Sequence, residues 1–287
     1  MMEKDGQAIR KGINRFIKRM PSLSTTVGKV MEICSRMDAS PNELNKVISL
    51  DPVLTGQVLK LINSAYYSLM NKVTSLTRAI TMLGMNTVKN MALSTAIIRS
   101  VSGAKKSRAL PTKKFWAHSI STGVCAKLLA KANDVPVFEC EEYFVAGLLH
   151  DLGKIPFGDE YIAVLLQAQQ DNQPLIEVER ELMGIDHQEV GRLIAEKWKL
   201  NEAMTCAICF HHNVEEAPEE HRVLAAYVGL ANMYANILDL GYAGDPFPAE
   251  KGADKLLALT GLTWEMFGEI AESVEDEIQK AQVFLQV

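Results

Sequence analysis

The chain has 287 residues, of which 48% are hydrophobic and 23% are charged, and its formal net charge at pH 7 is −5. This composition is that of a globular protein and excludes fibrous and disordered chains. The negative net charge, without a concentrated basic segment, argues against nucleic acid as a partner.

Residues 1–20 are charged throughout and lack the continuous apolar stretch of a signal peptide or membrane anchor. Five cysteines at irregular spacing agree with free thiols in a reducing compartment. We therefore expect a cytoplasmic protein with no membrane partner.

Apolar residues recur every three or four positions along most of the chain, and alternating patterns are nearly absent, which predicts an all-α fold. Asp51 is predicted to cap a helix that has Pro52 at its first position. Capping residues of the same kind predict helix starts at Ser24, Ser40, Ser75 and Asn86. Gly84 is predicted to end the helix that starts at Ser75.

The stretch "SGAKKSRALP" at 102–111 is polar, small and basic, so we place a boundary there between a subdomain at 1–105 and another at 106–287. Longer periodic segments follow the boundary. They predict helices at 112–132, 139–152, 160–172, 174–183, 187–199, 201–211, 221–240 and 262–284.

Several polar side chains are predicted to fall on the buried faces or at the ends of these helices. A single inward histidine is more often a hydrogen-bonded core residue than a ligand. Five of the six histidines, however, could converge beside one carboxylate, and burying so many titratable rings without a metal would be costly. The set is His118, His150, Asp151, His187, His211 and His212, and Asn232 lies on the buried stripe of its own helix. Such ligands suit a divalent transition metal, Fe, Mn, Ni or Zn, and a carboxylate can bridge two ions.

Three other residues with reactive or charged side chains carry less weight. Cys206 and Cys209 form a C-x-x-C pair inside an apolar helix, and we interpret them as small core residues. His221 lies in a polar segment and is assigned no role.

Two long segments, "DPVLTGQVLKLINSAYYS" and "SLTRAITMLGMNTVKNMAL", resemble the HDOD domain, a bacterial signalling module in the HD superfamily of all-helical metal-dependent phosphohydrolases. The resemblance extends to roughly residue 240. It implies an HD-superfamily helical bundle with an N-terminal helical subdomain. It also implies a role in signal transduction, with signalling proteins as partners.

The later motifs resemble the HD-GYP phosphodiesterases, which hydrolyse cyclic di-GMP. The matching elements are His118, "HDLGK" at 150–154, His187 in "HQEVGRLIAEKW" and the His211-His212 pair. In that resemblance His118, His150 and Asp151 would hold one metal. Asp151, His187, His211 and His212 would hold a second, with Asp151 bridging. Lys154 would help to neutralise the phosphate of a nucleotide or cyclic dinucleotide. Lys154 could equally be a surface lysine at a helix end.

The chain departs from that pattern at two places. Asn232 stands where the resemblance places a metal-binding aspartate, and "HHNVEEAPEEHR" stands where the GYP segment should follow. Loss of an anionic ligand weakens the hold on an ion by about 10–100-fold or more. We therefore expect one metal bound well, or two with the first weakly held, and slow or no hydrolysis.

Three functions are compatible with these features. The first is a regulatory HDOD module whose metal site is structural or senses a ligand. The second is a metal-dependent phosphohydrolase in which Asp151 and Lys154 take part in catalysis. The third is a helical interaction protein that holds no metal.

Overall fold

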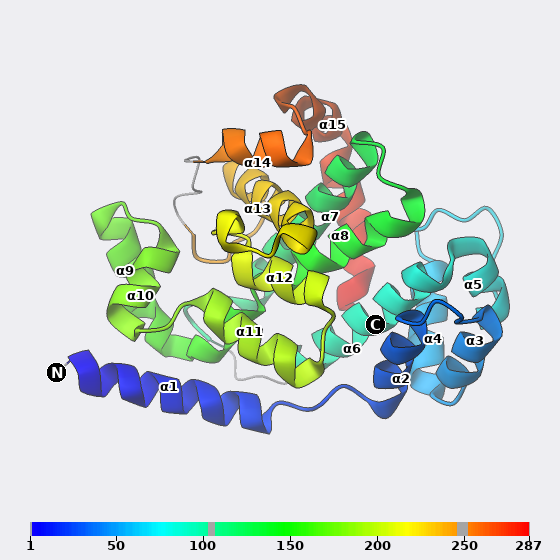
Figure 1. Cartoon of the computed structure of the whole chain (residues 1–287), viewed down its shortest axis with the longest axis horizontal. Coiled ribbons are helices and arrows are strands. Elements are labelled where there is room, and N and C mark those ends of the chain that lie inside the picture. Colours follow the sequence, from blue (N-terminus) through cyan, green and yellow to red (C-terminus); the bar gives the residue numbers. More distant parts are fainter. Residues whose placement is uncertain (1, 103–106, 246–251, 287) are drawn as a thin grey trace.

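The computed structural model describes residues 2–102, 107–245 and 252–286, and within these ranges it contains helices and no strands. The all-α prediction is confirmed. In the same ranges, every helix is too short or too polar to cross a membrane. Figure 1 shows α2 to α5 gathered at one end of the molecule, with α6 leading from them into the remaining helices.

The first helices are α1 (Met2–Arg19), α2 (Thr25–Cys34), α3 (Pro41–Ser49), α4 (Pro52–Ile62), α5 (Leu76–Leu83) and α6 (Met85–Ser102). Side chains of Ser24, Ser40, Asp51 and Ser75 each accept a hydrogen bond from the backbone N–H three residues later, which confirms these predicted caps. Asn86 as a cap is wrong, because α6 already begins at Met85. Gly84 does end α5, and its φ of 82° suits glycine.

The second group of helices is α7 (Thr112–Ala132), α8 (Val137–Leu149), α9 (Tyr161–Asp171), α10 (Leu175–Met183), α11 (His187–Trp198), α12 (Glu202–Phe210), α13 (Arg222–Ile237), α14 (Ala253–Thr260) and α15 (Trp264–Ala281). Short 3₁₀ segments are η1 (Leu152–Glu160), η2 (Val214–Glu216), η3 (Glu219–His221) and η4 (Gln282–Leu285). Most predicted bounds hold within a few residues. The predicted helix at 139–152 instead ends at Leu149, and α1 and α14 were not anticipated.

Helices α7 and α8 cross closely at two glycines. A Cβ on Gly147 would lie 2.7 Å from Cα of Gly123, and a Cβ on Gly123 would lie 2.6 Å from the carbonyl oxygen of Phe144. Both distances are shorter than real side chains allow, so only glycine permits this approach. The crossing brings the C-terminal end of α8 beside the first turns of α7.

The apolar core is continuous across the predicted boundary near residue 105. Tyr66, which follows α4, packs against Phe144 of α8 and Phe284 of η4, with ring centroids 5.4 and 5.3 Å apart. Helix α1 packs against η1, α10 and α11 rather than on the other N-terminal helices, as Figure 1 also shows. The division of the chain into subdomains at 1–105 and 106–287 stays a prediction.

Candidate metal centre

Asp151 lies at the centre of the predicted site, fully buried, and its two carboxylate oxygens face different side chains. Oδ1 lies 3.6 Å from Nε2 of His187 and 3.7 Å from Nε2 of His211. Oδ2 lies 3.2 Å from Nε2 of His150 and 2.8 Å from Nζ of Lys154. Residues that are far apart in the sequence therefore meet around one carboxylate.

Local structure at the start of α11 places His187 against this carboxylate. Asp186 caps the helix by accepting a hydrogen bond of 2.8 Å from the backbone N–H of Glu189, so His187 is the first helical residue. Gly153 passes directly beside it: a Cβ there would lie 1.8 Å from the carbonyl oxygen of His187. The glycine in "HDLGK" is thus required for η1 to approach α11.

Three of the histidines point Nε2 at the centre because their other ring nitrogen is already engaged. Nδ1 of His150 lies 2.7 Å from the carbonyl oxygen of Gly147, and Nδ1 of His211 lies 3.1 Å from that of Ile208. Nδ1 of His187 lies 2.7 Å from a carboxylate oxygen of Glu179. All three partners are acceptors, so each Nδ1 donates a hydrogen bond and each Nε2 is turned toward Asp151.

This arrangement brings three possible ligand atoms together. Nε2 of His187 and Nε2 of His211 are 3.3 Å apart, within hydrogen-bond distance of each other, and both face Oδ1 of Asp151, which has no hydrogen-bond donor in the described part of the chain. A cation between these three atoms would satisfy all of them. Ligand atoms that share one first-row ion at about 2.0–2.2 Å lie roughly 3–3.5 Å from one another, close to the separations seen here.

His212 and His118 complete two groups of candidate ligands. His187, His211 and His212 offer ring nitrogens within 4.8 Å of one another. The ligand atoms of His118, His150 and Asp151 meet the same limit. The described residues therefore fit a divalent transition metal through imidazole and carboxylate ligands.

Asn232 forms part of the second of these groups through His118. Its Oδ1 lies 2.9 Å from Nε2 of His118 and accepts a hydrogen bond of 3.1 Å from Nδ2 of Asn236. Nδ1 of His118 is buried and has no hydrogen-bond partner among the described residues. The amide thus contacts the predicted ligand, but it brings no negative charge.

Lys154 is 1% exposed, so the alternative of a surface lysine is wrong. Burial by itself would lower the pKa of Lys154, but the carboxylates of Asp151, Asp245 and Glu179 together outweigh it and raise the pKa. Burial would likewise raise the pKa of Asp151, yet attraction to His150 and Lys154 keeps that pKa well below its ordinary value. The pair is therefore charged at neutral pH.

Burial has the opposite consequence for three of the rings. It lowers the pKa of His118 to about 3, with His150 adding to the effect. Burial and the neighbouring His212 and His150 hold the pKa of His211 well below its usual range, and burial and His187 do the same to the pKa of His212. All three imidazoles are neutral at physiological pH, which is the form that binds a metal.

Glu179 is a functional residue that our sequence analysis missed. It is fully buried, and besides Nδ1 of His187 its Oε2 accepts a hydrogen bond of 2.9 Å from the His187 backbone N–H. Its other oxygen accepts a hydrogen bond from the hydroxyl of Tyr161. A carboxylate that holds a ligating histidine in this way fixes the ring and raises its basicity.

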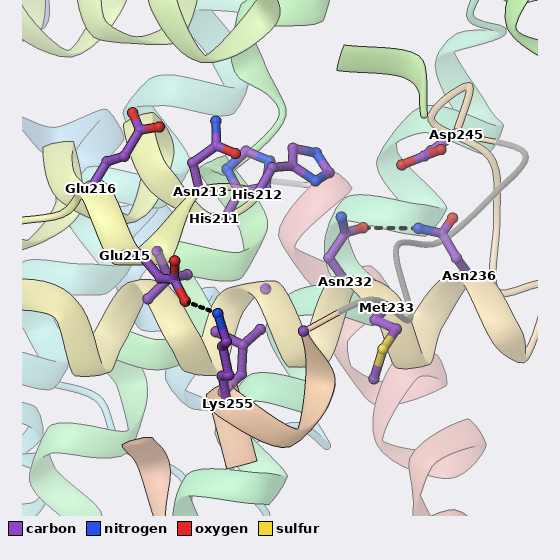
Figure 2. A pocket seen from close by; sticks show the side chains of 14 residues that line it. His211, His212, Asn213, Glu215, Glu216, Asn232, Met233, Asn236, Asp245 and Lys255 are labelled. Carbon is purple, nitrogen blue, oxygen red and sulfur yellow. Dashed lines mark hydrogen bonds and ion pairs between the residues drawn. The ribbon is translucent and has the colours of Figure 1, made fainter. Parts of the chain in front are cut away.

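A pocket of about 280 Å³ opens beside the centre, and Figure 2 shows the side chains that line it. His211, His212 and Asn232 lie in the middle of the lining, with Glu215 and Glu216 on one side of them and Asp245 on the other. Lys255 lies at the rim and pairs with Glu215 at 2.6 Å. The pocket gives a ligand a path to the histidines.

The remaining candidates have no part in this centre. Cys206 and Cys209 are buried free thiols within α12, which agrees with their interpretation as core residues. His221 lies 3.4 Å from a carboxylate oxygen of the exposed Glu202, away from the buried cluster.

The chain is similar to several known proteins. An uncharacterized protein of Treponema pallidum is 28% identical over 228 residues, which are 78% of this chain and 43% of that protein. The chain thus spans less than half the length of this curated relative. A solved HDOD domain protein of unknown function from Geobacter sulfurreducens is 23% identical with a TM-score of 0.79, and the match covers 100% of both chains.

A second solved structure, from Shewanella amazonensis, belongs to a protein provisionally described as a phosphohydrolase. It is 23% identical with a TM-score of 0.69, and the match covers 96% of this chain and 97% of that one. At these identities the structures establish a shared fold. The family model described as "HDOD domain" matches residues 20–214, about two thirds of the sequence. The chain therefore belongs to the HDOD family.

Proposed function

We propose that this chain is a bacterial signal-transduction module that holds a divalent transition metal at an HD-like centre and has weak or no catalytic activity. The observation that carries the proposal is the 3.3 Å approach of the His187 and His211 Nε2 atoms beside Oδ1 of Asp151. A cation there would bind Oδ1 of Asp151, a buried oxygen that has no hydrogen-bond donor among the described residues, and leaving such an atom unpaired is unfavourable.

The same set of ligands supports weak catalysis at best. Asp151 is the one carboxylate within reach of the histidine Nε2 atoms in the described structure, and Asn232 contributes a neutral oxygen in the place of an aspartate. A centre with so few anionic ligands holds a second ion poorly. In this role the metal holds helix ends in position or responds to the binding of a ligand. Signalling proteins are the partners that bind the resulting form of the module.

A metal-dependent phosphohydrolase acting on a nucleotide or cyclic dinucleotide is the second candidate, favoured by the pocket that reaches His211 and His212. A bound metal would polarise a phosphoryl oxygen and lower the pKa of water. Asn232 would then orient the ligand at the pocket wall. Lys154 lies outside the described lining of the pocket and is paired with Asp151, which weakens its proposed catalytic role.

Hydrolysis assays separate the two candidates. Protein loaded with Mn²⁺ or Fe²⁺, with the metal content confirmed, would be incubated with cyclic di-GMP and with bis(p-nitrophenyl) phosphate. We expect rates no higher than those of His211→Ala. Turnover of about 1 per second, a rate typical of enzymes, would overturn the proposed signalling module in favour of the phosphohydrolase.

A further inference from the structure

Helix α1 presents a face that is rich in positive charge. Between residues 9 and 20 the helix carries five cations and no acidic residue. We call the exposed side chains of these cations the basic face, and they are Arg10, Lys11, Arg15, Lys18 and Arg19. The opposite side of the helix packs into the core through the buried Ile13 and the partly buried Phe16. The cations are interspersed with apolar residues along the sequence, so only the helix gathers them on one surface.

The charge of the basic face is not neutralised within the molecule. None of its five cations forms an ion pair with another residue in the described part of the chain. Lys197 of α11 donates a hydrogen bond of 3.4 Å to the carbonyl oxygen of Lys18, which brings a further positive charge beside the face. Lys11, Arg15 and Lys18 are separated by four and three residues, a spacing at which like charges repel along a helix. Negative charge from outside the chain would relieve this repulsion.

Helix α15 carries a face of the opposite sign. Glu265, Glu269 and Glu272 are exposed, and the other side of the helix buries Phe267 and Val274. We call these three glutamates the acidic face. They are separated by four and three residues, as are the three central cations of α1, so each row of charge is about 10 Å long. Over the residues that the structure describes, these glutamates form no ion pair either.

The two faces cannot meet within one copy of the chain. Figure 1 shows α1 along one edge of the molecule and the first turns of α15 at the opposite edge. Trp264, at the start of the acidic face, is 50% exposed, and the arginines of a neighbouring α1 can stack on such a ring. Tryptophan and arginine are both enriched at protein interfaces. The acidic face of a second copy therefore matches the basic face in charge, spacing and side-chain type.

A second copy also suits the chain better than a polyanion. A nucleic acid or an anionic membrane is negative along its whole surface, and the net charge of −5 on the chain would oppose its approach. In a second copy the matching acids are confined to one helix.

We propose that the basic face of α1 binds the acidic face of α15 on a second copy of this chain. Because the faces lie at opposite edges, each copy in a pair keeps one face unused, so the contact is head to tail and further copies can add. Exposed ion pairs contribute little each, so the association is weak and sensitive to salt. A module of this kind assembles only where its local concentration is high.

Sedimentation velocity of the full chain at micromolar concentrations tests the contact. Native protein should self-associate in about 50 mM salt, and about 500 mM salt should weaken the association at least about 10-fold. Reversal of the basic face by Arg15→Glu with Lys18→Glu should weaken self-association by a similar factor, as should reversal of the acidic face by Glu269→Lys with Glu272→Lys.

A control variant separates the contact from a general effect of charge. Lys29→Glu with Lys46→Glu makes the same change in net charge as the reversal of the basic face, at exposed positions of α2 and α3. This variant should associate like the native protein.

Mixing the two reversed variants identifies the partner of each face. Each variant keeps one native face, so an equimolar mixture should form one-to-one pairs that do not grow. A chain with all four substitutions has exchanged the sign of both faces and should self-associate again. A native chain that stays monomeric in low salt, a mixture that stays monomeric, or self-association that survives both reversals would overturn the proposal. Binding of native protein to duplex DNA or to anionic vesicles without self-association would also overturn it, and would assign the basic face to that polyanion.

Discussion

At the scale of single residues, the candidate centre depends on side chains that set the orientation of the metal ligands. Glu179 accepts hydrogen bonds from both the backbone N–H and Nδ1 of His187, and Tyr161 donates to its other oxygen. The position of His187 Nε2 is therefore fixed before a metal arrives. Preorganisation of this kind strengthens metal binding.

Replacing Glu179 with glutamine should weaken metal binding by about 10–100-fold, because the neutral amide accepts less strongly from His187. A competition titration with a chromophoric chelator measures the affinity. Glu177→Gln is the matched control, since Glu177 is exposed on the same helix and should leave the affinity unchanged. Equal affinities for the two variants would show that Glu179 does not orient the ligand.

The sequence predicted most of this centre but not Glu179. Six residues chosen as polar side chains on buried faces or at helix ends, Asp151 and five histidines, do lie together, and Asn232 contacts His118 while Lys154 contacts Asp151. Glu179 shares the stripe of Leu175 and Met183, so the same criterion would have found it. Glu177 and Glu181 on either side of it are exposed, so the segment as a whole has the composition of a solvated helix face.

At the scale of elements, the centre exists because helix ends approach more closely than side chains would allow. Gly153 lies at the contact between η1 and α11. Gly229 of α13 lies against His211, where a Cβ would come within 2.5 Å of the carbonyl oxygen of His211. Four helix caps, at Ser24, Ser40, Asp51 and Ser75, followed from local sequence. The end of α8 at Leu149 did not follow from local sequence, because it depends on this contact between η1 and α11.

Gly153→Ala should destabilise the fold by at least about 2 kcal/mol, because the added methyl group meets the backbone of His187 and Gly191. Metal binding should weaken with it as α11 moves away from Asp151. Chemical denaturation gives the free energy of unfolding. Gly56→Ala is the control: its site in α4 has no atom within 4 Å, and helix propensity favours alanine there. A Gly153→Ala variant as stable as native protein would contradict the close approach.

At the scale of the whole molecule, the folded chain holds several histidines neutral in one continuous core. One feature of this scale lies beyond the sequence pattern. Helix α1, outside the residues matched by the HDOD family model, packs over η1, α10 and α11, with Ile13 buried. Such long-range packing has no local signature, whereas the amphipathic helices that build the core do.

The metal-free protein should lose stability as the pH falls from about 7 to about 5. The pKa of His118 is lowered to about 3 and that of His211 lies well below its usual range, whereas both rise to about 6.5 on unfolding. Below pH 6.5 the unfolded chain therefore binds more protons, and each ring contributes a loss of roughly 1 kcal/mol per pH unit. The low pKa of Asp151 acts only below about pH 4.

Urea denaturation after chelation, at pH 7, 6 and 5, measures this slope. His118→Asn should reduce the slope, whereas His221→Ala should preserve most of it because His221 lies outside the core. An unchanged free energy of unfolding between pH 7 and pH 5 would mean that the rings are not held neutral.

The most direct test of the metal centre is the metal content of untagged protein purified without chelators, measured by elemental mass spectrometry. We predict about one Fe, Mn, Ni or Zn ion per chain in the native protein and in His221→Ala, and loss of most of it in His211→Ala. A native chain with no stoichiometric metal, or a His211→Ala variant that keeps its full content, would contradict the account.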